Sequence, residues 1–349
     1  MKREAHGTQQ PRHINQIDEE ASTAQRSDSP VQSINQRFLS KIFGKIKLRT
    51  DHFFLKETAS MTHNSDYHHL LLAYDLSSRC DRALDRAVQL TRDWKAELLV
   101  VHAIDPVHAT RYTKLTQELP SWRRPENYQT VVERRLSLDL EADEVKAKVY
   151  VAEGVPCEVV LKAAHQENSG LVITGLGHDE PLVRIQLGST VDELLRELPI
   201  PLMIVRRRVR GPYQHVVIAT DLSPASRPAL ETAVRWFSDA RLTLFHAYEG
   251  AGLERDASAN NAWSRTAHSQ CESFLAGTVI EPSVMHRLHR VIEKGQPGAL
   301  LCDYVHHEEV DLVVLGTHGR GGLLKTLIGS TAENLLHLLE CDTMVVRGR

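Results

Sequence analysis

Short runs of apolar residues alternate along this chain with longer stretches in which apolar residues recur at helical spacing. In the C-terminal part, the apolar runs that predict strands are 215–220, 242–247, 289–294, 310–316 and 343–347. The stretches between them that predict helices are 224–238, about 257–277, 297–308 and 330–340. The same order is found from about residue 66 onward. Alternation of this kind, with continuously apolar strands, predicts a parallel sheet covered by helices on both faces.

Two segments of the chain are copies of one unit. The sequence LLLAYDLSSRCDRALDRAV near residue 70 matches VVIATDLSPASRPALETAV near residue 216. Residues 170–206 and 311–347 share 13 identities in 37 ungapped positions, where ordinary residue usage gives about two or three. We therefore predict a first domain at 66–208, a second at 213–349 and a linker over the basic stretch 206–212, which contains Gly211-Pro212.

Residues 1–65 have no counterpart in the second unit and form an N-terminal extension, which we expect to be largely disordered. Within it, 34–49 repeats an apolar residue every four positions and carries five basic residues without an acid. Three interpretations stay open. The segment is a basic amphipathic helix that contacts an anionic membrane or a partner, it packs on the protein's own surface, or translation starts at Met61.

Composition narrows the class of protein. The 349 residues contain 42 Lys+Arg and 45 Asp+Glu, a net charge of −3 that argues against nucleic acid as the main partner. No stretch approaches the 18 consecutive apolar residues of a membrane span. The first residues contain no apolar core, so we expect no secretory signal. Five scattered cysteines without CxxC indicate neither a disulfide framework nor a zinc site, so we predict a cytoplasmic location. Cys157 follows Pro156 near a helix start, a position that can lower a thiol pKa.

The segment 316–331, GTHGRGGLLKTLIGST, follows the most apolar strand of the second unit and leads into a helix. Its glycines let backbone amides approach a ligand, and a helix start with Ser330 and Thr331 favours an anion. Arg320 and Lys325 add positive charge. These features suggest a phosphate cradle; the alternative is a glycine-rich turn with a helix cap. The spacing fits neither a Walker A loop nor a dinucleotide fingerprint.

The spacing G-x2-G-x9-G-[ST], met by Gly316, Gly319, Gly329 and Ser330, resembles the ATP-binding signature of the universal stress protein family. TDLSP at 220–224 and FHAYE at 245–249 are similar to the ends of that family's first two strands. The resemblance covers both units, as in tandem, UspA-like members. It implies two doubly wound, Rossmann-like parallel sheets of five strands each, of the adenine nucleotide alpha hydrolase type, packed as an intrachain pseudo-dimer. A further homodimer contact is an additional possibility that it leaves open.

The resemblance also implies a stress-response role and an ATP site, with Mg²⁺, in the second domain. It assigns Asp221 to the nucleoside, while the alternative is that this residue caps the helix near Pro224. The remaining positions that it assigns to ATP are Ala219 and Thr220 beside adenine, Ala247 with its backbone at the base, Leu315 and Gly316 beside ribose and phosphates, and Gly319, Arg320, Gly329, Ser330 and Thr331 along the phosphate chain.

The first unit departs from this pattern in the matching loop. His178 replaces the second glycine, and Asp179 and Glu180 stand where Arg320 and Gly321 stand in the second unit. Carboxylates beside a triphosphate repel it, so we expect the first domain to bind ATP weakly or not at all. The alternative is that Asp179 or Glu180 holds Mg²⁺, which would reverse the sign of the interaction.

Two classes of function compete. A nucleotide-binding regulatory protein is favoured over a slow ATPase or autokinase, because the loop offers only His318 as a candidate base and no acidic partner for it. A nucleotide-free dimerisation scaffold is a third possibility. His102 and His246 occupy equivalent strand ends, for which sheet-end packing shared by the repeats is the preferred explanation over ligand binding.

Overall fold

The computed structural model describes residues 68–348 apart from 79, 125–126, 143–145, 177–186, 250–256 and 318–328. The N-terminal extension, including 34–49, lies outside these residues. So do the loop positions His178, Asp179, Glu180, His318, Gly319, Arg320 and Lys325.

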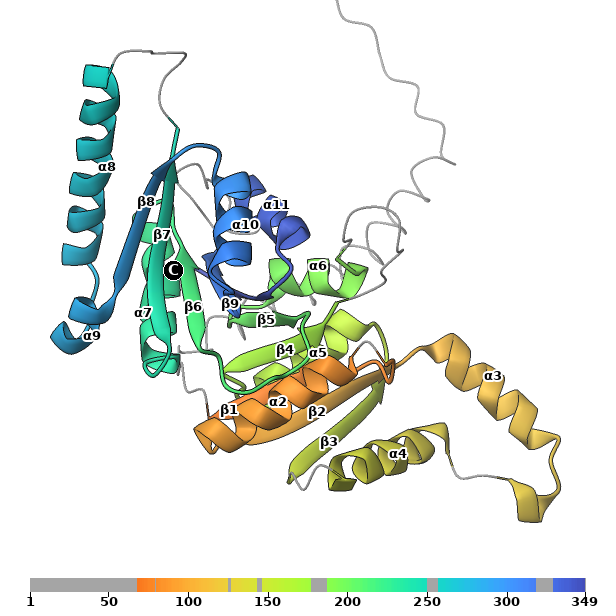
Figure 1. Ribbon diagram of the computed structural model, residues 1–349. Coiled ribbons are helices and arrows are strands. Elements are labelled where there is room, and N and C mark those ends of the chain that lie inside the picture. Colours follow the sequence, from red (N-terminus) through yellow and green to blue (C-terminus); the bar gives the residue numbers. More distant parts are fainter. Residues whose placement is uncertain are drawn as a thin grey trace, which may run out of the picture. The chain divides into compact units, whose positions relative to one another are not determined.

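Each repeat is built from five strands with helices between them (Figure 1). The first contains β1 (His69–Ala73), α2 (Asp81–Trp94), β2 (Glu97–Ile104), α3 (Pro106–Gln117), η1 (Ser121–Arg123), α4 (Tyr128–Ala142), β3 (Ala147–Glu153), α5 (Pro156–Gln166), β4 (Leu171–Gly175), α6 (Ser189–Glu197) and β5 (Leu202–Val205). The second contains β6 (His215–Ala219), η2 (Pro224–Ser226), α7 (Arg227–Trp236), β7 (Arg241–Tyr248), α8 (Ala257–Ala276), α9 (Pro282–Arg287), β8 (His289–Lys294), α10 (Pro297–His307), β9 (Leu312–Gly316), α11 (Ser330–Leu338) and β10 (Asp342–Val346).

The ten strands form one sheet in the order β3-β2-β1-β4-β5-β10-β9-β6-β7-β8. All pairs within a repeat are parallel, which confirms the predicted α/β class with two doubly wound halves of five strands. The halves are joined edge to edge by an antiparallel pairing of β5 with β10, in which Met203 faces Met344. These two methionines are equivalent positions of the repeat, 141 residues apart, so a local twofold relation passes between them.

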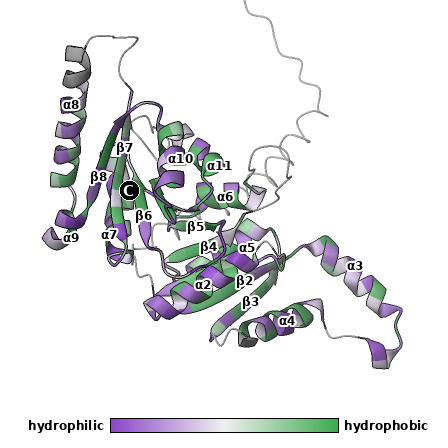
Figure 2. Ribbon diagram, in the orientation of Figure 1, coloured by the Kyte–Doolittle hydropathy of each residue, from purple (hydrophilic) through white to green (hydrophobic). Residues whose placement is uncertain are grey.

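Both faces of the sheet are covered, and each apolar core continues from one repeat into the other. One core packs strand side chains against α2, α4, α7 and α8, and the other packs them against α5, α6, α10 and α11. On the first face, Trp94 at the end of α2 meets Trp236 of α7 with ring centroids 5.8 Å apart. Figure 2 shows the hydrophobic colour concentrated on the strands, while the helices carry polar stripes. Burial on both faces explains why the strands read as continuous apolar runs.

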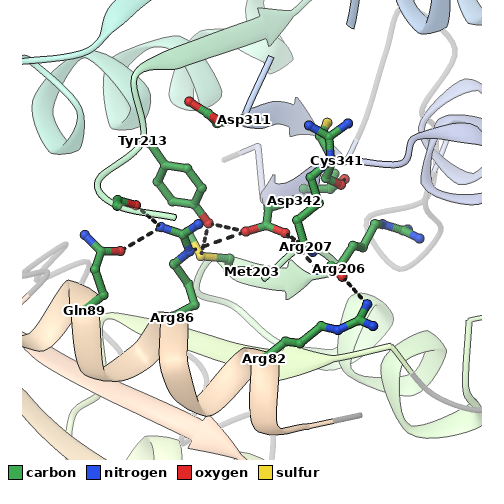
Figure 3. A network of polar contacts seen from close by, with 12 residues as sticks. Arg82, Arg86, Gln89, Met203, Arg206, Arg207, Tyr213, Asp311, Cys341 and Asp342 are labelled. Carbon is green, nitrogen blue, oxygen red and sulfur yellow. Dashed lines mark hydrogen bonds and ion pairs between the residues drawn. The ribbon is translucent and has the colours of Figure 1, made fainter. Parts of the chain in front are cut away.

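The junction of the repeats holds a buried carboxylate, Asp342, at the start of β10 (Figure 3). Its Oδ1 accepts hydrogen bonds from the backbone N–H groups of Arg206, at 2.8 Å, and Arg207, at 3.0 Å. Its Oδ2 accepts one from the Tyr213 hydroxyl at 2.7 Å and lies 3.5 Å from Nε of Arg86. One carboxylate thus ties together β10, the chain after β5 and helix α2.

Arg86 extends the network from the first repeat. Its guanidinium donates to the carbonyl of Gly211 at 3.0 Å and to Gln89 at 2.7 Å, and it lies over the ring of Tyr213, 3.9 Å from the centroid. Arg82, one turn earlier on α2, donates to the carbonyl of Arg206 at 2.7 Å. The basic stretch predicted as a linker is therefore bonded to α2 near both of its ends, at Arg206 and Gly211.

Replacing Asp342 by alanine should lower the free energy of unfolding by about 3–5 kcal/mol, because it leaves the buried Arg86 and two backbone donors without their acceptor. Urea unfolding measures this. The control is Glu308→Ala, which removes a half-exposed ion pair with Arg241 and should cost under about 1 kcal/mol. Equal effects of the two substitutions would contradict the central role of Asp342.

Tyr213 should make the protein less stable in alkali. Burial, reinforced by the neighbouring Asp342, raises the pKa of its phenol well above the ordinary value. The contribution of a group with a raised folded-state pKa is complete below its unfolded pKa, about 10, and is lost as the pH rises through the folded pKa. Unfolding free energy measured between pH 8 and 11 should therefore fall less steeply in Tyr213→Phe than in the wild type. Identical slopes would show that the phenol does not contribute.

Candidate functional site

The strand order reverses between β6 and β9 in the second repeat. From β6 the chain proceeds to β7 and β8 on one side, then returns to place β9 on the other side of β6. At the carboxyl ends, Ala219 of β6 pairs with Leu315 of β9 and with Phe245 of β7. A reversal of this kind is where open α/β sheets bind ligands, because the loops that leave the two strands diverge there.

The segment that leaves β6 folds into a tight turn. The carboxylate of Asp221 accepts the N–H of Ser223 at 3.0 Å, and Oγ1 of Thr220 accepts the N–H of Leu222 at 2.9 Å. Leu222 has a φ of +61°, a left-handed conformation that costs a residue with a side chain about 1–2 kcal/mol. Such strained positions concentrate at functional sites.

The local hydrogen bonds test the helix-cap role considered for Asp221. The N-cap of η2 is Ser223 and that of α7 is Ser226. Asp221 precedes both and bonds within its own turn. The helix-cap alternative is therefore wrong, and the carboxylate stands at the edge of the site, half-buried rather than enclosed.

His246, near the end of β7, contacts the backbone of this turn. Its Nδ1 lies 2.9 Å from the carbonyl oxygen of Thr220, whose own N–H donates to the carbonyl of Phe245 at 3.0 Å. His102 makes the equivalent contact with the carbonyl of Tyr74 at 2.8 Å. The duplicated histidine is thus a packing and hydrogen-bonding feature of the sheet end, as the preferred explanation predicts.

The first repeat reproduces the turn at the end of β1. Leu76 has a φ of +64°, and the N–H of Ser77 donates to Asp75 at 2.8 Å. Partial burial alone would raise the pKa of Asp75, but hydrogen bonds from Ser77 outweigh it and lower that pKa. The carboxylate form is therefore the one this turn stabilises.

Two substitutions distinguish the first turn from the second. Tyr74 replaces Thr220, and its hydroxyl donates to Asp81 at 2.7 Å instead of serving the turn. Cys80 replaces Ser226, whose Oγ donates to the carbonyl of Ser223 and meets Oγ1 of Thr220. The turn in the second repeat is consequently the more densely hydrogen-bonded.

Helix α11 is the next helix after β9, and its first turn is uncapped. Its N-cap is Gly329, and no side chain in the described part of the chain caps it. Ser330 and Thr331 are exposed and occupy the first two helical positions. The N–H of Gly329 donates to the carbonyl of Thr317 at 2.8 Å, which brings the two ends of the glycine-rich loop together. The amides that open α11 are therefore available to an anion.

Gly316 and the hydroxyl of Ser223 have no explanation in the contacts of the described residues. A Cβ added to Gly316 would meet Ser226 only at ordinary contact distance, 3.4 Å, and Gly316 has no left-handed φ. The hydroxyl of Ser223 is buried and has no hydrogen-bond partner among the described residues. A glycine without an internal steric reason and an orphaned hydroxyl both suit a site that a ligand completes.

The structure brings together most of the residues that the sequence singled out. At the ends of β6 and β9 lie Ala219, Thr220, Asp221, Leu315 and Gly316. Near the end of β7 lies Ala247, and α11 opens with Gly329, Ser330 and Thr331. Gly319 and Arg320 lie outside the described residues. Sequence reasoning missed Leu222 and Ser223, although the triplet Asp-Leu-Ser, present in both repeats, carried the signal.

Other kinds of site receive little support. Among the described residues, no group of three or more His, Cys, Asp or Glu side chains is arranged to hold a metal ion. Nor does that part of the chain contain a helix both long and apolar enough to cross a membrane. Cys157 does begin a helix, but burial, helped by Glu193, raises its thiol pKa to about 12 instead of lowering it.

The cysteines should therefore react slowly in the folded protein. Burial, reinforced by Asp75, raises the pKa of Cys80 to about 12, and burial does the same for Cys341. With 5,5′-dithiobis(2-nitrobenzoic acid) at pH 8, we expect the half-buried Cys302 to react first and the buried thiols only on unfolding. Cys302→Ser should remove the fastest phase. Rapid labelling of Cys157 would contradict the assignment of an inert thiol.

Most of the chain matches a known protein family. The family model described as the universal stress protein family matches residues 66–206 and 212–347. Universal stress protein E of Salmonella typhi is 25% identical over 310 residues, which cover 80% of this chain and 94% of that protein. Universal stress protein A homolog 1 of Coxiella burnetii is 32% identical over 144 residues, 38% of this chain and 96% of that protein.

Solved structures agree on the fold. A universal stress protein from Archaeoglobus fulgidus matches with a TM-score of 0.56 and 18% identity, covering 81% of this chain and 99% of that chain. A protein of unknown function from Pseudomonas aeruginosa matches with a TM-score of 0.58 and 20% identity, covering 81% of this chain and 94% of that chain. With two tandem matches that together span most of its length, the chain belongs to the universal stress protein family.

Proposed function

We propose that this protein is an ATP-binding regulatory protein of the stress response that holds its nucleotide in the second repeat. Membership of the family supports the stress-response role. The observation that carries the ATP proposal is that the Asp221 turn and Gly316 lie where the strand order reverses, while the uncapped start of α11 is bonded through Gly329 to Thr317, the residue after Gly316. Each of these features matches a different part of a nucleotide.

The chemistry of the site suits that division. The carboxylate of Asp221 can accept hydrogen bonds from ribose hydroxyls, with Ala219, Thr220 and Ala247 beside the base. Leu315 and Gly316 would flank the ribose and phosphates, and the amides of Gly329, Ser330 and Thr331 would receive the phosphate chain. Gly319 and Arg320 are proposed to complete the phosphate contacts from the loop. Bound Mg²⁺ would neutralise part of the phosphate charge.

The first repeat is proposed to bind ATP weakly or not at all. Its turn shares the left-handed leucine and the aspartate-to-serine hydrogen bond of the second repeat, so the proposed difference comes mainly from the loop, where Asp179 and Glu180 replace Arg320 and Gly321. Two charges 4 Å apart repel by about 1 kcal/mol in water and by several times more where solvent is excluded. The first repeat then serves mainly as the structural partner of the second.

A binding role is favoured over turnover. Phosphoryl transfer needs a positioned base, and the histidine that contacts the turn, His246, is already engaged with the carbonyl of Thr220. We further propose a cytoplasmic location and protein partners that respond to nucleotide occupancy. A second copy of the chain is one such partner. Membrane contact through 34–49 is a separate hypothesis that a truncation lacking this segment would test.

Calorimetric titration of the full chain with Mg·ATP should give about one site, with binding abolished by Gly319→Asp, which places bulk and negative charge in the cradle. Asp221→Asn retains an Oδ1 for the Ser223 N–H but loses the charge, so ATP affinity should fall by about tenfold. The matched control is Asp75→Asn, the same change in the first repeat, which should leave ATP affinity unaltered.

The outcomes separate the hypotheses. A stoichiometry near two would show that the first repeat also binds ATP and that the electrostatic argument about Asp179 and Glu180 is wrong. Absence of binding would leave the nucleotide-free scaffold. Release of phosphate from ATP by the wild type, lost in Gly319→Asp, would favour the enzyme.

A further inference from the structure

Two arginines cross the junction of the repeats in opposite directions. Arg206 follows β5 and Arg347 follows β10, and they are equivalent positions of the repeat. A guanidinium Nη2 of Arg206 donates to the carbonyl of Leu336 in the last turn of α11. A guanidinium Nη2 of Arg347 donates to the carbonyl of Arg196 in the last turn of α6. Each repeat therefore holds the final helix of the other.

The helix that Arg206 holds is the one that opens the proposed phosphate site. Helix α11 has nine residues, so its two ends lie about 13 Å apart. Its N-terminus is Gly329, and its C-terminal carbonyls lack partners within the helix. Arg206 supplies a donor to one of these carbonyls and a positive charge to the negative end of the helix dipole.

Burial makes this contact effective over the length of a short helix. Arg206 is only 5% exposed, so solvent screens its charge much less than that of a surface arginine. At an effective dielectric constant of 20, unit charges separated by about 13 Å still attract enough to change an equilibrium roughly tenfold. The same contact ties the last turn of α11 to the chain that follows β5.

We propose that Arg206, a residue of the first repeat, is a positioning residue for the phosphate site of the second repeat and sets its preference for ATP over the uncharged nucleoside. The inference rests on the proposed ATP site. Its new element is that the site depends on a side chain from the other domain, acting through α11. The nucleoside part of the site, built on the Asp221 turn, makes no use of Arg206.

The chain offers close controls for this residue. Arg207, the next residue, also crosses the junction, but it donates to the carbonyls of Glu340 and Val310, each at 3.2 Å, which lie outside α11. Arg347 is the repeat-related arginine and holds α6 instead. In Arg206→Met the backbone N–H still donates to Asp342, so the main-chain part of the junction is preserved.

The experiment measures the dissociation constants of Mg·ATP and of adenosine by calorimetry on the full chain. Arg206→Met should weaken ATP binding about tenfold and change adenosine binding by less than about twofold. Arg206→Lys, which restores the charge, should recover part of the loss. Arg207→Met and Arg347→Met should leave both constants unchanged. Thermal melting of each variant confirms folding. If the methionine variant does not fold, Arg206→Lys carries the test, and it should show a partial loss of ATP binding with adenosine binding unchanged.

Three results would overturn the inference. One is unchanged ATP binding in a folded Arg206 variant, with the wild type binding normally. Another is an equal loss for ATP and adenosine, which marks a general structural role. A third is the same selective loss in Arg207→Met. Failure of the wild type to bind ATP would instead overturn the proposed function itself.

Discussion

The two halves of this protein depend on one buried carboxylate. Between β5 and β10 only three residue pairs are in register, a short seam for a sheet of ten strands. Asp342 reinforces the seam with two backbone donors, one phenol and one guanidinium, all from outside its own strand. A buried charge with this many partners stabilises only one arrangement of the chain around it, since any other leaves the carboxylate or Arg86 unpaired.

The junction is symmetric in its strands and asymmetric in its charges. Met203 and Met344 face each other across the local twofold, and Arg206 and Arg347 cross it reciprocally. The position equivalent to Asp342 is Pro201, which has no side-chain acceptor. Both copies therefore contribute equivalent strands to the junction. Only the second copy supplies the acidic residue, Asp342, that binds groups of the first copy. The same asymmetry of charge appears in the loops, where only the second repeat retains the glycine and arginine pattern.

Both repeats retain a strained turn after their first strand. Leu76 and Leu222 adopt nearly the same left-handed conformation, with φ of +64° and +61°. Each follows an aspartate whose carboxylate accepts a hydrogen bond from the backbone N–H of the serine two residues further on. An apolar core gives no reason to preserve a conformation that costs free energy. Presenting a carboxylate to a ligand at the point of strand reversal is such a reason. The geometry of the turn therefore supports the proposed ligand role of Asp221 independently of the glycine signature.

The sequence by itself determined the strands, the helices, the duplication and the family, because periodicity and spacing are properties of neighbouring residues. It located the strand ends within a residue or two. That Asp221, Gly316 and Gly329 share one ligand site stays a prediction, which follows from parallel strands bringing their carboxyl ends together. It missed α9 and the left-handed Leu222. Only the tertiary structure decided that β5 pairs with β10, that Arg206 is buried against α11, and that burial raises the pKa of Cys157. These outcomes depend on contacts between residues far apart in the chain and on the exclusion of water, and neither is encoded in a local pattern.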